Sequence, residues 1–371
     1  LQAFGLFLRD LQSEDIIVSH FNDDIYYLAI YNPYGNHNVD AVYRKIGQRT
    51  EQPFQMMGNI EQKITVSIGV ANYPESARNS LEIINCAEIV QSQKKESGTN
   101  SIAYFEAPIL TDFIENIQIE NKLKDAIENH AFELYYQPQY DAGSKKLRGV
   151  EALIRWRGQD GKFVSPAVFI PLAEKDGLIV QIGNWVLEEG IRVYADWYRK
   201  YGYPMVLSLN ISALQYKKAD FVHHLLVLIE KYQVDPALIE LEITESVLIE
   251  DFNSVVDKLN TLKEYGIKIS LDDFGTGFSS LSYLKGLPID TLKIDKSFID
   301  TVINDHPTRV ITESIIAMVK KLGCETVAEG VETQEQYDYL KAVNCDNIQG
   351  FLLGKPMPAE GVEKILSSIK K

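Results

Sequence analysis

The second two thirds of the chain alternate short apolar runs with helical stretches, and this alternation constrains the fold more than any other feature. Eight apolar runs follow one another, at residues 133–140, 147–156, 205–211, 239–244, 267–271, 291–294, 326–328 and 347–353. Strands that alternate with helices are typical of strand–helix–strand units, which build a parallel sheet. Eight runs within residues 131–371 predict a TIM-like (β/α)8 barrel, with its active site at the C-terminal ends of the strands.

The segments between these runs are predicted helices, at residues 166–200, 213–232, 252–265, 307–322, 333–342 and 359–370. Residues 1–107 have a different rhythm, with helices at 2–12 and 80–95 and strands at 24–31, 64–71 and 101–105. This region predicts a smaller N-terminal α+β domain. Pro108 interrupts it, and residues 108–130 are a predicted connecting helix into the second domain at 131–371.

The composition is that of a soluble globular protein, with 45% apolar and 24% charged residues. A net charge of −15 argues against a nucleic-acid polymer or an anionic membrane as partner, whereas a small anionic ligand can still bind through local cations. The three cysteines lack the spacing of a zinc cluster or a disulfide framework, which favours a cytoplasmic location. The chain begins without a methionine, so we interpret it as a fragment and leave open an upstream sensor or membrane segment.

Each of the eight apolar runs contains a polar side chain or leads directly into one. These positions are Gln137, Glu151, Asn210, Glu242, Asp272 with Asp273, Lys293, Glu329 and Gln349. One rim of a barrel would then gather several acids, for which packing alone has no use. Oxygen ligands without histidine or cysteine favour Mg²⁺ or Mn²⁺ over zinc, and the surplus of carboxylates predicts two ions. A pair of such ions is a recurrent solution for phosphoryl chemistry.

Asp272 and Asp273 are adjacent carboxylates at the end of an apolar run. At about 4 Å and an effective dielectric of about 20 they would repel by roughly 4 kcal/mol, so a cation or strong hydrogen bonds must compensate them. The alternative is an exposed turn that caps the next helix. Lys293 can orient or deprotonate a water, or form an ordinary salt bridge. Arg155, on the same strand face as Glu151, can hold a phosphate oxygen or form a surface ion pair.

Eight short segments in the second half of the chain carry these positions in a fixed order. They are residues 137–138, 151–156, 210–212, 242–246, 272–277, 293–295, 329–332 and 349–351. Together they resemble the EAL family of cyclic di-GMP phosphodiesterases over the whole second half. Eight ordered segments are far more specific than the three letters Glu-Ala-Leu at residues 151–153.

The resemblance implies a role for each position. The implied metal ligands are Glu151, Asn210, Glu242, Asp272, Asp273 and Glu329, the implied catalytic residues Lys293, Glu329 and Glu151, and the implied nucleotide contacts Gln137, Arg155 and Gln349. Glu245 would brace the loop 273–280, and its alternative is an acid at a helix N-terminus. The resemblance also implies two Mg²⁺ or Mn²⁺ ions per site and a homodimer. None of these positions departs from the family pattern, so catalysis is expected.

The segment 19–26 is similar to the GGDEF region of diguanylate cyclases, over only the later part of that domain. Asn22 and Asp23 stand where that family has two glycines, and Ile25 stands where it has the catalytic glutamate. Isoleucine cannot ligate magnesium and glycines let the backbone approach a nucleotide, so cyclase activity is expected to be absent. The family's inhibitory RxxD pair is missing as well. A regulatory or dimerising role is expected, with GTP binding left open.

These features predict metal-dependent hydrolysis of cyclic di-GMP to linear pGpG by a two-metal in-line mechanism, in which the 3′ oxygen leaves. One alternative is a non-catalytic receptor that binds cyclic di-GMP and signals through the first domain. The other is a scaffold that neither binds nor hydrolyses the nucleotide. Product formation that depends on the metal distinguishes the three hypotheses.

Overall fold

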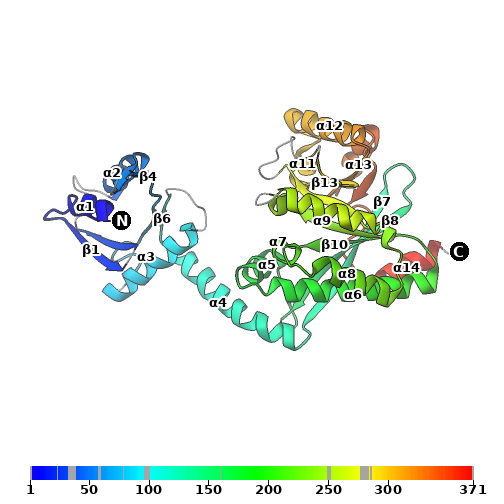
Figure 1. Ribbon diagram of the computed structural model, residues 1–371, viewed down its shortest axis with the longest axis horizontal. Helices are drawn as coiled ribbons and strands as arrows, with labels where there is room; N and C mark the ends of the chain where they lie inside the picture. Colours follow the sequence, from blue (N-terminus) through cyan, green and yellow to red (C-terminus); the bar gives the residue numbers. More distant parts are fainter. Residues whose placement is uncertain are drawn as a thin grey trace. The chain divides into compact units, whose positions relative to one another are not determined.

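The computed structural model describes residues 2–22, 24–31, 39–56, 60–77, 79–95, 101–158, 160–248, 252–275, 284 and 286–369. The chain divides into two compact units, Leu1–Gln118 and Ile119–Lys371 (Figure 1). The division lies within helix α4 (Ala107–Glu128), the helix that the sequence analysis treats as a connector. Among the described helices, none has both the length and the apolar content that a membrane crossing needs.

The first unit packs helices against short paired strands. Its described elements are α1 (Gln2–Arg9), β1 (Ile16–Asn22), β2 (Ile25–Ile30), α2 (Val39–Glu51), β3 (Phe54–Met56), β4 (Ile60–Gln62), β5 (Ser67–Val70), α3 (Ser80–Lys95) and β6 (Ser101–Tyr104). β1 pairs with β2 and β3 with β4 in antiparallel fashion, whereas β5 and β6 are parallel. A small core gathers Phe4, Leu8, Ile16, Ile46 and Phe54.

Besides β1, three elements of the first unit have no counterpart among the predicted ranges. β3 and β4 have three residues each, which is too short to display a strand period. The helix α2 buries Val42, Ile46 and Thr50, and it contains Gly47, so its apolar stripe is narrow and interrupted. α1 also ends earlier than predicted, at Arg9 instead of Gln12.

The second unit is a closed barrel in which the eight predicted runs all supply strands, so the predicted fold class is confirmed. The barrel strands are β7 (Phe132–Asp141), β8 (Leu147–Arg157), β10 (Val206–Ile211), β11 (Ile239–Thr244), β12 (Lys268–Phe274), β13 (Thr291–Ile294), β14 (Glu325–Ala328) and β15 (Asn347–Gln349). They follow the order β10-β11-β12-β13-β14-β15-β7-β8, and β8 pairs back with β10 to close the barrel. The short strand β9 (Phe163–Val164) pairs with the end of β8.

The expectation of an all-parallel barrel is wrong for one strand. β7 runs antiparallel to both of its neighbours, β8 and β15, whereas the other barrel pairs are parallel. The reason is the length of the connection after β7. Only residues 142–146 separate β7 from β8, and a parallel pair needs a crossover of roughly a dozen residues or more. The two strands therefore form a hairpin.

The helices of the second unit surround the barrel (Figure 1). They are α5 (Pro166–Lys175), α6 (Ile179–Tyr201), α7 (Ala213–Tyr216), α8 (Phe221–Tyr232), α9 (Phe252–Glu264), α11 (Lys296–Thr301), α12 (His306–Lys321), α13 (Gln334–Ala342) and α14 (Ala359–Ile369). The predicted helix 166–200 is in fact two, because Gly177 has φ 71° and breaks it between α5 and α6. The predicted helix 213–232 is likewise divided into α7 and α8, and α11 was not predicted.

Side chains along the barrel strands alternate between two environments. On β11, Leu241 and Ile243 are buried in the apolar core that also includes residues of α6. The residues between and beside them, Glu240 and Glu242, are buried too, yet their partners are polar groups of other barrel strands. A strand directs successive side chains to opposite faces. The barrel interior is therefore polar, and the main apolar core lies between the strands and the helices.

Strand β8 approaches β10 closely at Gly149, where a Cβ atom would lie 2.3 Å from the carbonyl oxygen of Val206. We expect Gly149→Ala to lower the free energy of unfolding by about 1–3 kcal/mol, because the added methyl group must displace backbone. Urea denaturation followed by tryptophan fluorescence measures this change, since Trp156, Trp185 and Trp197 all lie in the second unit.

Gly143→Ala is the matched control, in the turn between β7 and β8. Its new Cβ would meet nothing closer than the Asp141 Oδ1 atom at 3.5 Å. We expect a change of less than about 0.5 kcal/mol. Equal losses of unfolding free energy in the two variants would show that the close approach of the strands is not the reason why residue 149 must be glycine.

Candidate active site

The ammonium group of Lys293 lies inside the barrel among four carboxylates. Its Nζ atom is 2.7 Å from Glu242 Oε2, 2.8 Å from Glu329 Oε1, 3.3 Å from Asp272 Oδ1 and 3.4 Å from Glu151 Oε2. These acids come from β8, β11 and β12 and from the residue that follows β14. The Lys293 side chain is only 1% exposed. One ammonium cannot neutralise four carboxylates, so the group is short of positive charge whenever the acids are ionised.

Amide side chains fix the orientation of Glu151. Asn210 Nδ2 donates to Glu151 Oε1 at 2.7 Å, and Gln349 Nε2 donates to Glu151 Oε2 at 2.6 Å. Gln349 Nε2 also donates to Gln137 Oε1 at 3.2 Å, while Gln137 Nε2 donates to the carbonyl oxygen of Gly354. Both oxygens of the Glu151 carboxylate are thus held by amides of other strands. The predicted positions 137, 151, 210 and 349 are brought together.

Asp272 and Asp273 form a second part of the site with Glu329. Single ligand atoms of the three residues lie within 4.8 Å of one another, close enough to hold one metal ion. Strand β12 runs through both aspartates instead of ending before them. In a regular strand adjacent side chains point to opposite faces. Here Asp273 has φ 54° and the β12–β13 register shifts between Leu271 and Phe274, so both carboxylates reach the same site.

Burial and mutual repulsion alter the proton affinity of these acids. Burial raises the pKa of Glu242 well above its usual value, and the neighbouring Glu151 carboxylate raises it further. Burial, and then repulsion from Asp272, raises the pKa of Asp273. Burial also raises the pKa of Glu329 to about 8; the Lys293 ammonium opposes this increase and Asp272 adds to it. Without an added cation, the site therefore retains protons at neutral pH.

Glu151 and Lys293 keep their charges in this environment. Burial by itself would raise the pKa of the Glu151 carboxyl, but the Lys293 ammonium and the amide donors more than offset burial and lower that pKa. Burial would likewise lower the pKa of the Lys293 ammonium, yet the surrounding carboxylates raise it well above its ordinary value. The pair therefore remains an ion pair within a group of partly protonated acids.

The donor set fits hard divalent cations. All the charged candidate ligands are carboxylates, and Asn210 adds an amide oxygen. The buried Glu242 Oε1 atom has no hydrogen-bond partner among the described residues. A buried acceptor without a partner is costly unless another group occupies its lone pairs. Oxygen ligands in this number suit Mg²⁺ or Mn²⁺.

Arg155 and Glu245 lie beside this group. Arg155 is half-buried on β8, donates to the carbonyl oxygen of Ile154 and lies over the ring of Tyr135. Glu245 follows β11, and its Oε1 atom accepts a hydrogen bond from the backbone N–H of Gly275 at 3.3 Å. This contact holds the start of the loop that follows β12. Residues 276–280 of the predicted loop 273–280 lie outside the described residues.

A comparison with protein-family models matches residues 120–356 to the EAL domain. The chain belongs to the EAL domain family. The matched region contains all the site residues described above, and it confirms the family resemblance seen in the sequence.

Relatives of the EAL domain with curated names span both units of this chain. The chain is 38% identical over 325 residues to the bifunctional diguanylate cyclase/cyclic di-GMP phosphodiesterase MucR of Pseudomonas aeruginosa, covering 88% of this chain and 47% of MucR. It is 39% identical over 332 residues to the signaling protein YkoW of Bacillus subtilis, covering 90% of this chain and 41% of YkoW. The chain thus spans about half the length of the curated relatives it matches.

Solved structures show the same relationship. The PaMucR phosphodiesterase in complex with c-di-GMP aligns with a TM-score of 0.64 and 41% identity, over 66% of this chain and 99% of that chain. That match is about as long as the barrel unit, Ile119–Lys371.

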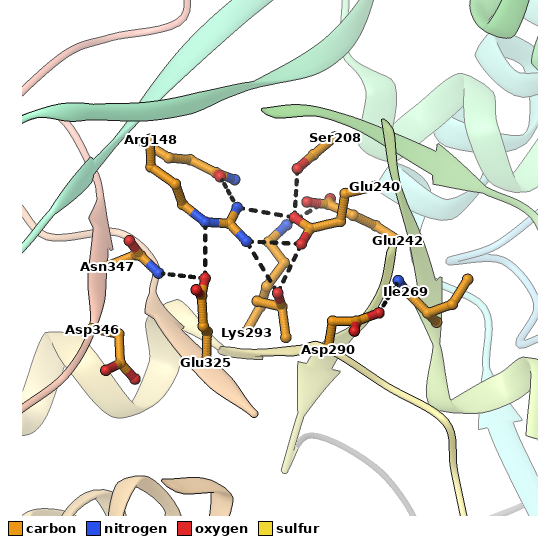
Figure 2. A network of polar contacts seen from close by, with 12 residues as sticks. Arg148, Ser208, Glu240, Glu242, Ile269, Asp290, Lys293, Glu325, Asp346 and Asn347 are labelled. Atoms are coloured by element: carbon orange, nitrogen blue, oxygen red, sulfur yellow. Dashed lines mark hydrogen bonds and ion pairs between the residues drawn. The ribbon is translucent and has the colours of Figure 1, made fainter. Parts of the chain in front are cut away.

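Sequence reasoning missed a second polar layer inside this EAL domain, one step deeper than the candidate site (Figure 2). Three residues of this layer lie two positions before a predicted site residue. Glu240 precedes Glu242, Ser208 precedes Asn210, and Thr291 precedes Lys293. Arg148 completes this layer by pairing bidentately with Glu240, its Nη1 and Nη2 atoms lying 3.0 and 2.8 Å from the two carboxylate oxygens. The two-residue spacing was a signal that could have revealed Glu240 and Thr291.

We expect Mg²⁺ binding to strengthen with rising pH between pH 6 and 8, by roughly tenfold per pH unit for the Glu329 proton alone. The proton on Glu329, whose pKa is raised to about 8, must leave before the carboxylate can ligate a cation. Binding therefore competes with protonation below that pKa and does not above it. Isothermal titration calorimetry with Mg²⁺ at a series of pH values measures this dependence.

Glu329→Gln provides the control, because an amide cannot be protonated in this range. The variant should bind Mg²⁺ more weakly and with a shallower pH dependence. The same slope in the variant and the original chain would mean that Glu329 is not the group that releases the proton.

Proposed function

We propose that this EAL domain hydrolyses cyclic di-GMP to linear pGpG, using two Mg²⁺ or Mn²⁺ ions per active site. The observation that carries the proposal is the buried Lys293 ammonium among the carboxylates of Glu151, Glu242, Asp272 and Glu329 at the C-terminal side of the barrel. The relative MucR is named a cyclic di-GMP phosphodiesterase, and its phosphodiesterase structure holds c-di-GMP. Both support cyclic di-GMP as the substrate.

The carboxylates supply the proposed metal ligands. Glu151, Asn210, Glu242 and Asp272 would hold one ion, and Asp272 with Asp273 and Glu329 would reach the second, in agreement with the ligand atoms grouped in the structure. When bound, the ions would activate a water and neutralise charge on the phosphodiester. Gln349 and Asn210 keep the Glu151 carboxylate in one orientation, so that its oxygens need no rearrangement on binding.

Lys293 acts as a donor in this scheme. Its Nζ atom lies within hydrogen-bonding distance of Glu242 and Glu329, so the ammonium is fixed and its protons point towards the acids. From this position it orients the attacking water and stabilises charge on the phosphodiester oxygens. The leaving 3′ oxygen departs in line with the attack, which produces the linear dinucleotide.

Gln137, Arg155 and Gln349 are the proposed nucleotide contacts. Arg155 is a guanidinium whose visible hydrogen bond goes to a backbone carbonyl, Ile154 O, and burial lowers its pKa despite the nearby Tyr135 and Glu151. A half-buried cation beside an acidic site suits a bidentate contact to a phosphate. Gln137 lies next to Gln349 and turns its Nε2 atom towards Gly354 O.

The first unit is proposed as an inactive GGDEF-like regulatory module, with GTP as its candidate ligand and a homodimer as the assembly. The hairpin of β1 and β2 supports this reading, because Asn22 pairs with Ile25 across its turn. Ile25, at the position that the resemblance assigns to the family's glutamate, offers no metal ligand. Asp23 lies outside the described residues. Glu245 is proposed to brace the loop after β12 through Gly275.

We expect Mn²⁺ or Mg²⁺ to support conversion of cyclic di-GMP to pGpG, and Ca²⁺ to support it poorly because of its looser coordination. Lys293→Ala and Asp272→Asn should each lower kcat by at least roughly a thousandfold, since each removes a group held against the reacting centre. Chromatographic detection of pGpG, with and without GTP, measures the effect.

Lys231→Ala is the matched lysine control, because Lys231 is exposed on α8 and pairs with Glu188. It should leave kcat unchanged while circular dichroism shows all variants folded. Nucleotide binding by the original chain without any pGpG would favour the receptor hypothesis instead. Unchanged turnover in Lys293→Ala would rule the scheme out.

We expect Arg155→Ala to raise the KM for cyclic di-GMP roughly tenfold or more, because it removes a charged hydrogen bond to phosphate. The Mn²⁺ dissociation constant should stay the same, since Arg155 is not among the proposed ligands. Arg157→Ala is the control from the same strand, where the guanidinium is already paired with Glu133. Steady-state kinetics with both variants decides the point, and an unaltered KM for Arg155→Ala would argue for a purely structural arginine.

A further inference from the structure

Arg148 enters the barrel interior through an irregularity of the β7–β8 hairpin. Gln139 pairs with Gly149 and Tyr140 pairs with Leu147, so Arg148 is the extra residue of a β-bulge. In a regular strand Arg148 would point to the face opposite Gly149 and Glu151. The bulge instead directs its guanidinium inward, where the side chain is 9% exposed and contacts Glu240, Thr291 and Gln139.

A continuous chain of hydrogen bonds leads from Arg148 to the candidate metal ligand Glu151. Arg148 Nη1 donates to Gln139 Oε1 at 2.6 Å, and Gln139 Nε2 donates to Gln349 Oε1 at 2.9 Å. Gln349 Nε2 in turn donates to Glu151 Oε2 at 2.6 Å. Gln139 is fully buried and Gln349 nearly so. Solvent therefore has little access to the middle of the chain.

The direction of every hydrogen bond in this chain is fixed by its two ends. An arginine can only donate, so the atom of Gln139 that faces Arg148 must be the amide oxygen. The Gln139 amino group then faces Gln349 and requires its oxygen there. This leaves the Gln349 amino group for the Glu151 carboxylate, which when ionised can only accept. A donor-only cation and an acceptor-only anion at opposite ends thus impose the same orientation on both amides.

We propose that Arg148 and Gln139 are positioning residues that set the orientation of the Gln349 amide and thereby hold the Glu151 carboxylate ready to bind a metal ion. This inference rests on the proposed function only in taking Glu151 as a metal ligand. If Gln139 could not donate, the orientation of the Gln349 amide would rest only on its own donations to Glu151 and Gln137. A reversed amide, which presents an oxygen to the Glu151 carboxylate, would then be more populated. Groups that orient a metal ligand from behind typically change metal affinity or activity by roughly 10–100-fold when removed.

The ion pair with Glu240 does not by itself explain the contact to Gln139. Glu240 accepts two hydrogen bonds from Arg148, one from Ser208 Oγ at 2.8 Å and one from Thr291 Oγ1 at 2.7 Å. The arginine thus has structural partners in Glu240 and Glu325 (Figure 2), and a separate link through Gln139 to the candidate site. Arg148→Met would leave the buried Glu240 carboxylate without its cation and would destabilise the fold. The informative position is therefore Gln139.

Two variants of the full chain test the inference, with Mn²⁺ alone as the probe. Gln139→Met keeps the volume and removes the link, and Gln139→Glu keeps the shape and the contact with Arg148 but cannot donate to Gln349 when ionised beside that cation. We call the hydrogen-bond chain from Arg148 through Gln139 and Gln349 to Glu151 the relay. If it acts as proposed, the Mn²⁺ dissociation constant should rise roughly 10–100-fold in both variants. Isothermal titration calorimetry measures it, and urea denaturation confirms that both variants fold.

Gln139→Glu separates orientation from charge and from packing. If charge alone mattered, an added carboxylate near the cation site would tighten Mn²⁺ binding. If residue 139 served only in packing, Mn²⁺ binding would stay unchanged. Weakened binding therefore supports the relay, and either other result overturns it. Ser208→Ala, which removes a different hydrogen bond to Glu240, should keep the original dissociation constant. A similar loss in that control would overturn the relay as well. Wild-type chain that binds Mn²⁺ but makes no pGpG would refute the proposed function and leave this test intact.

Discussion

Burial of several like charges inside one barrel is the constraint on which the rest of this structure depends. The interior holds two layers of acidic groups, and each layer has one cation at its centre, Lys293 in the outer layer and Arg148 in the deeper one. Arg148 keeps the buried Glu240 carboxylate ionised. Burial by itself would raise the pKa of Glu240, but the guanidinium lowers it to about 2. Lys293 faces four carboxylates and cannot do the same. The Arg148–Glu240 pair of the deeper layer is therefore compensated, whereas the outer layer has more acids than cations, so protons or added cations must neutralise the remaining carboxylates.

This division of charge also explains where the apolar core lies. A barrel of this type commonly fills its interior with branched apolar side chains. Here the interior positions of β11 are Glu240 and Glu242, and apolar residues such as Leu241 face the helices. The stability of the unit must then come mainly from packing of helices against the outside of the strands. The interior is free to carry chemistry because it is not needed as the main core.

Sequence reasoning recovered the elements whose signal is local. Each apolar run became a barrel strand, and four of the acids predicted to meet at one rim lie within 3.4 Å of Lys293 Nζ, namely Glu151, Glu242, Asp272 and Glu329. It failed where the signal was not local. The direction of β7 followed from the length of one turn, which the parallel pattern of the other strands obscured. The inward position of Arg148 depends on a bulge that only the strand register reveals, because plain alternation assigns that residue to the outer face.

The reversed strand and the bulge together connect the two charge layers. On the parallel strands a higher residue number lies nearer the rim, as for Glu240 and Glu242, whereas on antiparallel β7 Gln139 lies deeper than Gln137. The hairpin then returns through Arg148 in the deeper layer to Glu151 in the outer one. A single local hairpin thus supplies the Arg148 guanidinium, the Gln139 amide that accepts its hydrogen bond and the Glu151 carboxylate at the other end of the chain of hydrogen bonds. Had β7 been parallel, its path towards the rim would have been reversed, and Gln139 would lie away from the cation that orients it.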